Sequence, residues 1–154
     1  MKIIFNFVFI ALFVFSVSAQ VNEARKIDEF GNISCDDLTA RFDNFFLQLT
    51  ELDNSKGYVL VYEGNLLSPL YNKDGKTIKP RRGEAKAQIL TMKSRIKFSR
   101  FDEKRIVFVN GRFRENLTIE LWIVPTDVTP PKPTPTLKKM KYRKGKPGNF
   151  CDAL

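Results

Sequence analysis

The stretch that decides the fold is Tyr58-Val59-Leu60-Val61-Tyr62, in which every residue is apolar or aromatic. β-branched and aromatic residues favour extended chain, and apolar side chains on both parities indicate a strand that is covered on both faces. We therefore expect residues 58–62 to form the central strand of a sheet.

Two further strands are predicted later in the chain. Residues 105–109 are apolar on both parities and end at Asn110-Gly111, which is typical of a turn. Residues 117–124 alternate between apolar side chains and others, as a strand with one core face does. Because residues 110–116 form a short connection, we expect these two strands to pair antiparallel.

Apolar stripes predict two amphipathic helices. The first should span Cys35 to Asp53, with Ser34 as its N-cap and Gly57 in a turn after its end. The second should span Gly83 to Arg100. The apolar side chains that define the two stripes are Leu38, Phe42, Phe45, Phe46, Leu49 and Leu52 in the first helix, and Ala85, Ile89, Met92 and Ile96 in the second.

These elements predict an α+β domain with a single mixed sheet and two helices packed on one face, in the order (β)αβαββ. The optional first strand is an irregular one within residues 26–33, and a long loop is expected over residues 63–80. The other face of the sheet would carry Trp122 with Tyr58 or Tyr62, an aromatic strip that needs a cover or a ligand.

Three segments are expected along the chain. Residues 1–19 resemble a secretory signal peptide, with Lys2 before an apolar run and small side chains at Val17 and Ala19 before the expected cleavage site; the alternative is an uncleaved N-terminal anchor. Residues 20–126 form the α+β domain, and residues 127–154 form a Pro-rich linker and a basic C-terminal tail. We expect an exported protein, periplasmic or secreted, without a membrane-spanning segment after cleavage.

The composition excludes several classes of chemistry. The chain has 26 Lys and Arg against 17 Asp and Glu, and no His. Without imidazole there is no Ser-His or Cys-His nucleophile pair and no His-ligated metal. We therefore expect no catalytic residue, no metal site and no cofactor.

The two cysteines are Cys35 and Cys151. An even number of cysteines in an exported chain favours a disulfide, which would hold the tail against the domain. An intermolecular bridge and two free thiols are the alternatives.

Two resemblances extend this interpretation. The segments Asp28–Asn32, Arg81–Ala85 and Glu120–Pro125 resemble a group of uncharacterised secreted bacterial proteins, such as occur in acidobacteria. The order of elements over residues 27–125 is similar to OmpA-like C-terminal domains of bacterial envelopes. The OmpA-like resemblance implies a peptidoglycan stem-peptide site with an Asp after the central strand and an Arg before the next helix. This chain has Glu63-Gly64-Asn65 where the Asp is expected, and Arg82 is the nearest counterpart of the Arg.

The residues themselves also indicate an anion or ligand site. Arg81 and Arg82 precede the second helix, where unpaired backbone N–H groups and the helix dipole favour an anion. The alternative is that both arginines are solvated or paired with Glu63, Asp74 or Glu84. Glu63 follows the central strand, a common position for ligand-binding groups. As a lone carboxylate it supports hydrolysis only weakly, because glycoside hydrolysis normally uses two.

The basic tail is the second candidate site. Its cations can bind phosphate-rich envelope polymers, and they are Lys138, Lys139, Lys141, Arg143, Lys144 and Lys146. The alternative is a segment that only increases solubility. Nucleic acid is disfavoured because the chain is expected to be exported. We expect a non-catalytic cell-envelope interaction module, whose partners are peptidoglycan, lipopolysaccharide, an anionic lipid surface or an envelope protein. The alternatives are a degenerate OmpA-like domain that binds anionic peptidoglycan peptide through the Arg82 region, and a secreted hydrolase that uses Glu63.

Overall fold

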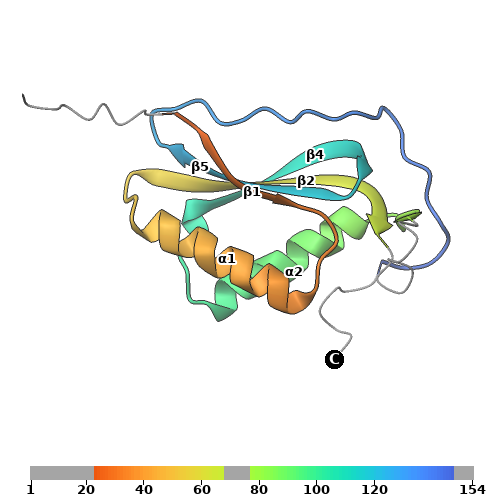
Figure 1. Cartoon of the computed structure of the whole chain (residues 1–154), viewed down its shortest axis with the longest axis horizontal. Helices are drawn as coiled ribbons and strands as arrows, with labels where there is room; N and C mark the ends of the chain where they lie inside the picture. The colour runs from red at the N-terminus through yellow and green to blue at the C-terminus, as the bar shows by residue number, and fades with distance from the viewer. Residues whose placement is uncertain (1–22, 68–76, 148–154) are drawn as a thin grey trace, which may run out of the picture.

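The computed structural model describes residues 23–67 and 77–147, and it contains one mixed sheet with two helices on one face (Figure 1). The predicted α+β class is confirmed. The predicted signal peptide and Cys151 lie outside the described residues. In chain order the elements are β1 Arg25–Phe30, α1 Cys35–Thr50, β2 Ser55–Leu67, β3 Thr77–Ile78, α2 Glu84–Phe98, a 3₁₀ helix Glu103–Arg105, β4 Ile106–Asn116 and β5 Thr118–Pro125.

The predicted central strand is the middle of β2, which pairs in parallel with β4 and antiparallel with β5. β1 adds to the outer side of β5, with a register shift between Lys26 and Asp28, and β3 pairs with the end of β2. The expected loop over residues 63–80 is therefore shorter, because β2 continues to Leu67. Residues 68–76 lie outside the described part of the chain.

The prediction that β4 and β5 pair with each other is wrong, because they lie on opposite sides of β2. The connection between them crosses over β2 at Gly64, and the backbone N–H of Leu117 donates to the carbonyl oxygen of Asn65 at 2.9 Å. A Cβ atom on Gly64 would lie 2.1 Å from the carbonyl carbon of Asn116. The crossing therefore requires glycine at this position.

The predicted turn at Asn110-Gly111 is also wrong, because β4 continues through it as a bulge. The pairing shifts so that Val61 faces Asn110 while Tyr62 faces Arg112. Arg112 takes a positive φ of 67°, and its N–H donates to the side-chain oxygen of Asn110 at 2.8 Å. The positive φ belongs to Arg112 and not to Gly111, and a Cβ atom on Gly111 would lie 2.4 Å from the ring of Tyr62. This glycine therefore serves close packing on Tyr62, which the local sequence does not reveal.

The two helices cover one face of the sheet (Figure 1). Ser34 caps α1 as predicted, accepting from the N–H of Asp37 at 3.2 Å. The helix ends at Thr50, earlier than predicted, and Gly57 lies inside β2, where a Cβ atom would be 2.6 Å from the ring of Phe45. The helix-facing core includes Leu38, Phe42, Phe45, Phe46, Leu49, Val59, Val61, Met92, Ile96, Ile119, Leu121 and Ile123.

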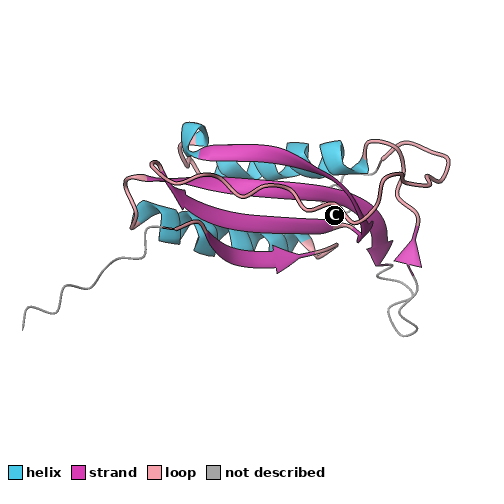
Figure 2. Cartoon of the chain, turned by 90° about the horizontal axis from the view of Figure 1, so that it is seen from above, coloured by secondary structure: helices cyan, strands magenta, loops and turns pink. Residues whose placement is uncertain are grey.

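The opposite face of the sheet is covered by the chain after β5. Residues 126–147, which we call the strap, run lengthwise along the strands over the face of the sheet away from the helices, and their end reaches the chain before α2 (Figures 1 and 2). Tyr62 is fully buried on this face, and Tyr58 and Trp122 are half-buried. The aromatic strip predicted here thus has a cover from the same chain. Neither helix in residues 23–67 and 77–147 is long and apolar enough to cross a membrane.

Candidate functional site

Thr134 is the first of the points at which the strap is attached over the sheet. Its backbone N–H donates to the hydroxyl of Tyr62 at 3.2 Å. The guanidinium of Arg114 donates to the carbonyl and hydroxyl oxygens of Thr134, at 3.2 and 2.6 Å. These bonds place one residue of the Pro-rich segment directly over the centre of the sheet.

Beneath Thr134 lies a buried carboxylate, Glu120, which is only 4% exposed. It accepts from Arg114 at 2.9 Å, from the indole N–H of Trp122 at 3.0 Å and from the hydroxyl of Tyr62 at 3.4 Å. The guanidinium of Arg114 also lies 3.6 Å from the ring centroid of Tyr62. A buried charge is tolerated when it is paired and hydrogen-bonded in this way. The network therefore joins β2, β4, β5 and the strap.

The second attachment is a short antiparallel contact between the strap and β4. The backbone N–H groups of Thr136 and Leu137 both donate to the carbonyl oxygen of Phe113, at 3.0 and 3.1 Å. No side-chain identity signals such a backbone contact, so sequence reasoning did not find it.

The third attachment brings the predicted site residues together. The hydroxyl of Tyr142 donates to Glu63 at 2.7 Å, and its ring lies 5.2 Å from the guanidinium of Arg82. Arg81 donates to the carbonyl oxygen of Lys146 at 2.8 Å. The strap also pairs with the chain before α2, because the N–H of Arg143 donates to the carbonyl oxygen of Pro80 at 3.0 Å. Glu63, Arg81 and Arg82 are thus each in contact with the last part of the strap.

The surroundings of Glu63 favour a protonated Tyr142. Burial and the hydrogen bond to the Glu63 carboxylate raise the pKa of Tyr142 to about 12, an effect that the charge of Arg82 partly offsets. The second oxygen of Glu63 is buried and has no hydrogen-bond partner among the described residues. Tyr142 is therefore a hydrogen-bond donor to Glu63 across the ordinary pH range.

The start of α2 is also occupied by groups of the chain itself. The N-cap residue is Gly83, whose φ of 91° suits glycine, and it provides no side-chain cap. The carboxylate of Glu84 accepts from the backbone N–H of Arg81 at 3.0 Å. An internal anion thus already lies where the predicted external anion would bind.

The basic tail, in contrast, keeps most of its charge at the surface. The side chains of Tyr142 and Arg143 are half-buried, and Arg82 beside them is exposed. The two acids nearby, Glu63 and Glu84, are buried and engaged. The exposed cations of this segment, which we call the strap lysines, are Lys138, Lys139, Lys141, Lys144 and Lys146.

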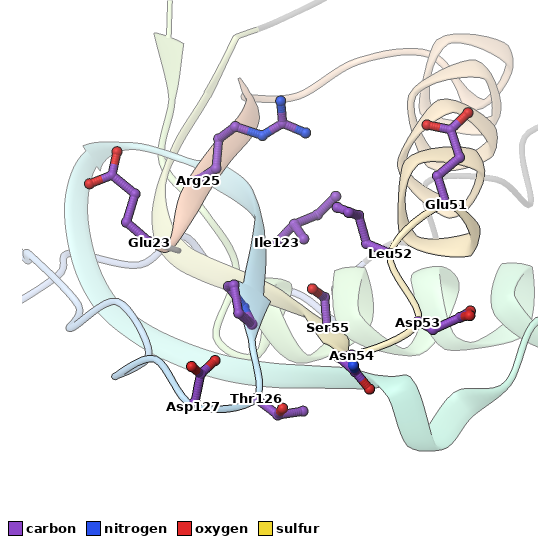
Figure 3. Close-up of a pocket in the computed structure, with 11 residues that line it drawn as sticks. Glu23, Arg25, Glu51, Leu52, Asp53, Asn54, Ser55, Ile123, Thr126 and Asp127 are labelled. Carbon is purple, nitrogen blue, oxygen red and sulfur yellow. The ribbon is translucent and has the colours of Figure 1, made fainter. Parts of the chain in front are cut away.

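A groove of about 720 Å³ lies beside the start of β1, the end of α1 and the chain after β5 (Figure 3). Sequence reasoning did not predict it. The charged residues that line the groove are Glu23, Arg25, Glu51, Asp53 and Asp127.

In the described part of the chain no group of three or more His, Cys, Asp or Glu side chains could hold a metal ion.

The disulfide remains a prediction, because Cys35 begins α1 while Cys151 lies outside the described residues.

Comparison of the chain with known protein families, with curated proteins and with solved structures finds no match. The geometry of the chain itself is therefore what supports a proposal about its function.

Proposed function

We propose that the protein is a non-catalytic exported module that binds anionic, phosphate-bearing components of the cell envelope through the strap lysines. The observation that carries the proposal is that these five side chains are exposed on a segment attached to the domain. Tyr142 and the backbone of Arg143 hold this segment beside Arg82.

Attachment matters because it reduces the entropy lost on binding. A free basic tail would lose backbone freedom as it settles on a charged surface, whereas an attached one has already lost it. Each Lys or Arg near an anionic surface contributes about 1 kcal/mol, and salt screens this attraction. The arrangement therefore supports binding to phosphate groups that are displayed densely, such as those of anionic phospholipid or lipopolysaccharide.

Binding of peptidoglycan peptide through Arg82 has less support. The strap places a carbonyl oxygen on Arg81, an aromatic ring on Arg82 and a hydroxyl on Glu63. A stem-peptide carboxylate would have to displace these contacts. The same hydroxyl engages Glu63, so a hydrolase that uses this carboxylate has less support as well.

The test is cosedimentation of the full chain with vesicles of phosphatidylcholine containing phosphatidylglycerol, or with lipopolysaccharide, over a series of salt concentrations. K141Q/K144Q removes two strap lysines, and K56Q/K132Q removes two exposed lysines that lie outside this group. We expect the first variant to lose about tenfold in affinity and to show a shallower salt dependence, because it loses two charges. Equal affinities for the two variants would overturn the proposal.

A further inference from the structure

The outward face of α2 combines positive charge with exposed apolar side chains. Leu90 is 56% exposed and Phe98 is 80% exposed. The only Asp or Glu within residues 84–98 is Glu84, which is buried. The exposed cations of this helix are Lys86, Lys93 and Lys97.

Helical spacing places these side chains along one side of α2. Lys86, Leu90, Lys93 and Lys97 follow one another at intervals of four, three and four residues, which is the repeat of a single helix face. Phe98 lies at the end of the helix, about 80° around its axis from Leu90, with the guanidinium of Arg95 5.7 Å from its ring centroid. Leu90 and Phe98 are the large apolar side chains that α2 exposes.

The neighbouring helix has the opposite character. α1 covers the same face of the sheet (Figure 1), but its exposed charges include Asp36 and Asp43. α1 also exposes one apolar side chain, Leu47, at 60%. The combination of cations with exposed apolar groups therefore belongs to α2 and is not a general property of the helical layer.

The strap reaches the start of α2. Arg81 donates to the carbonyl oxygen of Lys146, and the N–H of Arg143 donates to that of Pro80 (Figure 1). The basic end of the strap and the cationic helix are thus joined at this point.

We propose that the outward face of α2 docks on an anionic lipid bilayer, with Leu90 and Phe98 entering the boundary between headgroups and acyl chains. This inference rests on the proposed function and names its partner. Exposed Leu and Phe beside cations combine burial of apolar area with attraction to anionic lipid, the two contributions that hold amphipathic helices in a membrane interface. A soluble polyanion would be attracted by the cations alone and gives the exposed Phe98 no role, so the observations favour a bilayer.

The binding has two components that can be separated by salt. The cations contribute an electrostatic part that weakens as salt rises, while burial of apolar surface is insensitive to screening. We expect the wild-type chain to keep measurable affinity for phosphatidylglycerol vesicles at about 0.5 M salt, where the Debye length is only a few ångströms.

The experiment compares L90S/F98S with the control L47S, which removes an equally exposed apolar side chain from the acidic helix. We expect L90S/F98S to lose at least tenfold in affinity for phosphatidylglycerol vesicles and all of the binding at high salt. L47S should match the wild type, and both variants should bind soluble polyphosphate as the wild type does. Urea unfolding midpoints check that each variant is folded.

A direct measurement of insertion uses F98W. Brominated lipids quench a Trp that enters the acyl boundary, so we expect quenching of F98W well above that of the wild type, whose single Trp is Trp122 on the sheet. The absence of added quenching would overturn the inference. So would unchanged binding of L90S/F98S, or an equal loss in L47S.

The two proposals fail in distinguishable ways. If K141Q/K144Q loses vesicle affinity while L90S/F98S and F98W give the negative results above, the strap lysines bind anions and α2 does not dock on the bilayer. If the wild-type chain ignores anionic vesicles, lipopolysaccharide and polyphosphate alike, the proposed function falls, and the docking of α2 falls with it.

Discussion

Gly64 decides how the chain passes from β4 to β5. The backbone of Asn116 and Leu117 crosses so closely over β2 that a Cβ atom on Gly64 would lie 2.1 to 2.4 Å from three of its atoms. All three atoms belong to the backbone, so no flexible side chain can move away to make room for a Cβ atom. The position therefore tolerates only glycine, although a glycine after a strand reads locally as the start of a loop.

We expect Gly64→Ala to lower the free energy of unfolding by about 3 kcal/mol, the upper range for overpacked sites. Urea unfolding followed by circular dichroism measures it. Gly31→Ala is the control, since its Cβ atom would approach one carbonyl oxygen at 3.0 Å, and its loss should be smaller. If the two variants lost the same stability, the close crossing over β2 would be contradicted.

The Glu120 carboxylate is buried, the side chain of its partner Arg114 is 16% exposed, and Arg114 also donates to Thr134. Arg114→Met leaves a buried carboxylate without its cation, and we expect a loss of about 3 kcal/mol. R114M/E120Q removes the uncompensated charge as well, so part of the stability should return. If the stability losses of R114M and E120Q, measured by urea unfolding, add up to the loss of R114M/E120Q, the two charges do not interact.

Tyr142 gives a prediction about pH. The fold raises its pKa from 10.0 to about 12, so it favours the protonated phenol. The resulting contribution to stability is complete below pH 10 and is lost as the pH rises through 12. An ultraviolet titration of phenolate should show a component near pH 12 that is missing from Tyr142→Phe. Titration curves that do not differ between the two proteins in this pH range would contradict the contact with Glu63.

At the scale of elements, the patterns in the sequence predicted what depends on neighbours along the chain. The stripe of Phe and Leu predicted α1, Ser34 predicted its start, and the apolar run at residues 58–62 predicted the strand that the whole sheet is built around. Burial on one helix face and on both faces of a strand leaves a periodic signal. Pairing of β4 and β5 across β2 leaves none, because it depends on a long-range crossing at Gly64.

In the candidate site, too, local features were predicted from the sequence and long-range contacts were not. Charge and position in the chain indicated Arg81, Arg82 and Glu63 as separate candidates for ligand binding, and in the structure each of them contacts the strap. Their coverage by Tyr142 and Lys146 could not be predicted, since it depends on how the strap returns over the sheet. The exposure of Phe98 was not predicted either, because an apolar residue near a helix end is ordinarily part of the core.

The packing of α1 gives the test at this scale. Phe42 is fully buried against Phe45 and Phe46, whereas Leu47, five residues further along and so on another side of the helix, is exposed. We expect Phe42→Ala to cost about 3–5 kcal/mol of unfolding free energy and Leu47→Ala to stay within about 0.5 kcal/mol of the wild type. Denaturant unfolding of both variants measures the difference, and similar losses would mean that α1 presents another face to the sheet.

For the whole molecule, the strap is what turns a two-layer α+β domain into a three-layer one. Helices cover one face of the sheet and the strap covers the other (Figures 1 and 2). The strap buries Tyr62, completes the hydrogen bonds around Glu120 and carries the exposed lysines. Stability and the proposed binding surface thus depend on the same segment.

The central claim is that the strap belongs to the fold, and amide hydrogen exchange measured residue by residue by NMR on the full chain tests it most directly. We expect protection at Thr134, Thr136, Leu137 and Arg143, whose N–H groups donate to the domain, and faster exchange among the lysines between them. Exchange of these four amides at the rate of an unstructured peptide would contradict the account.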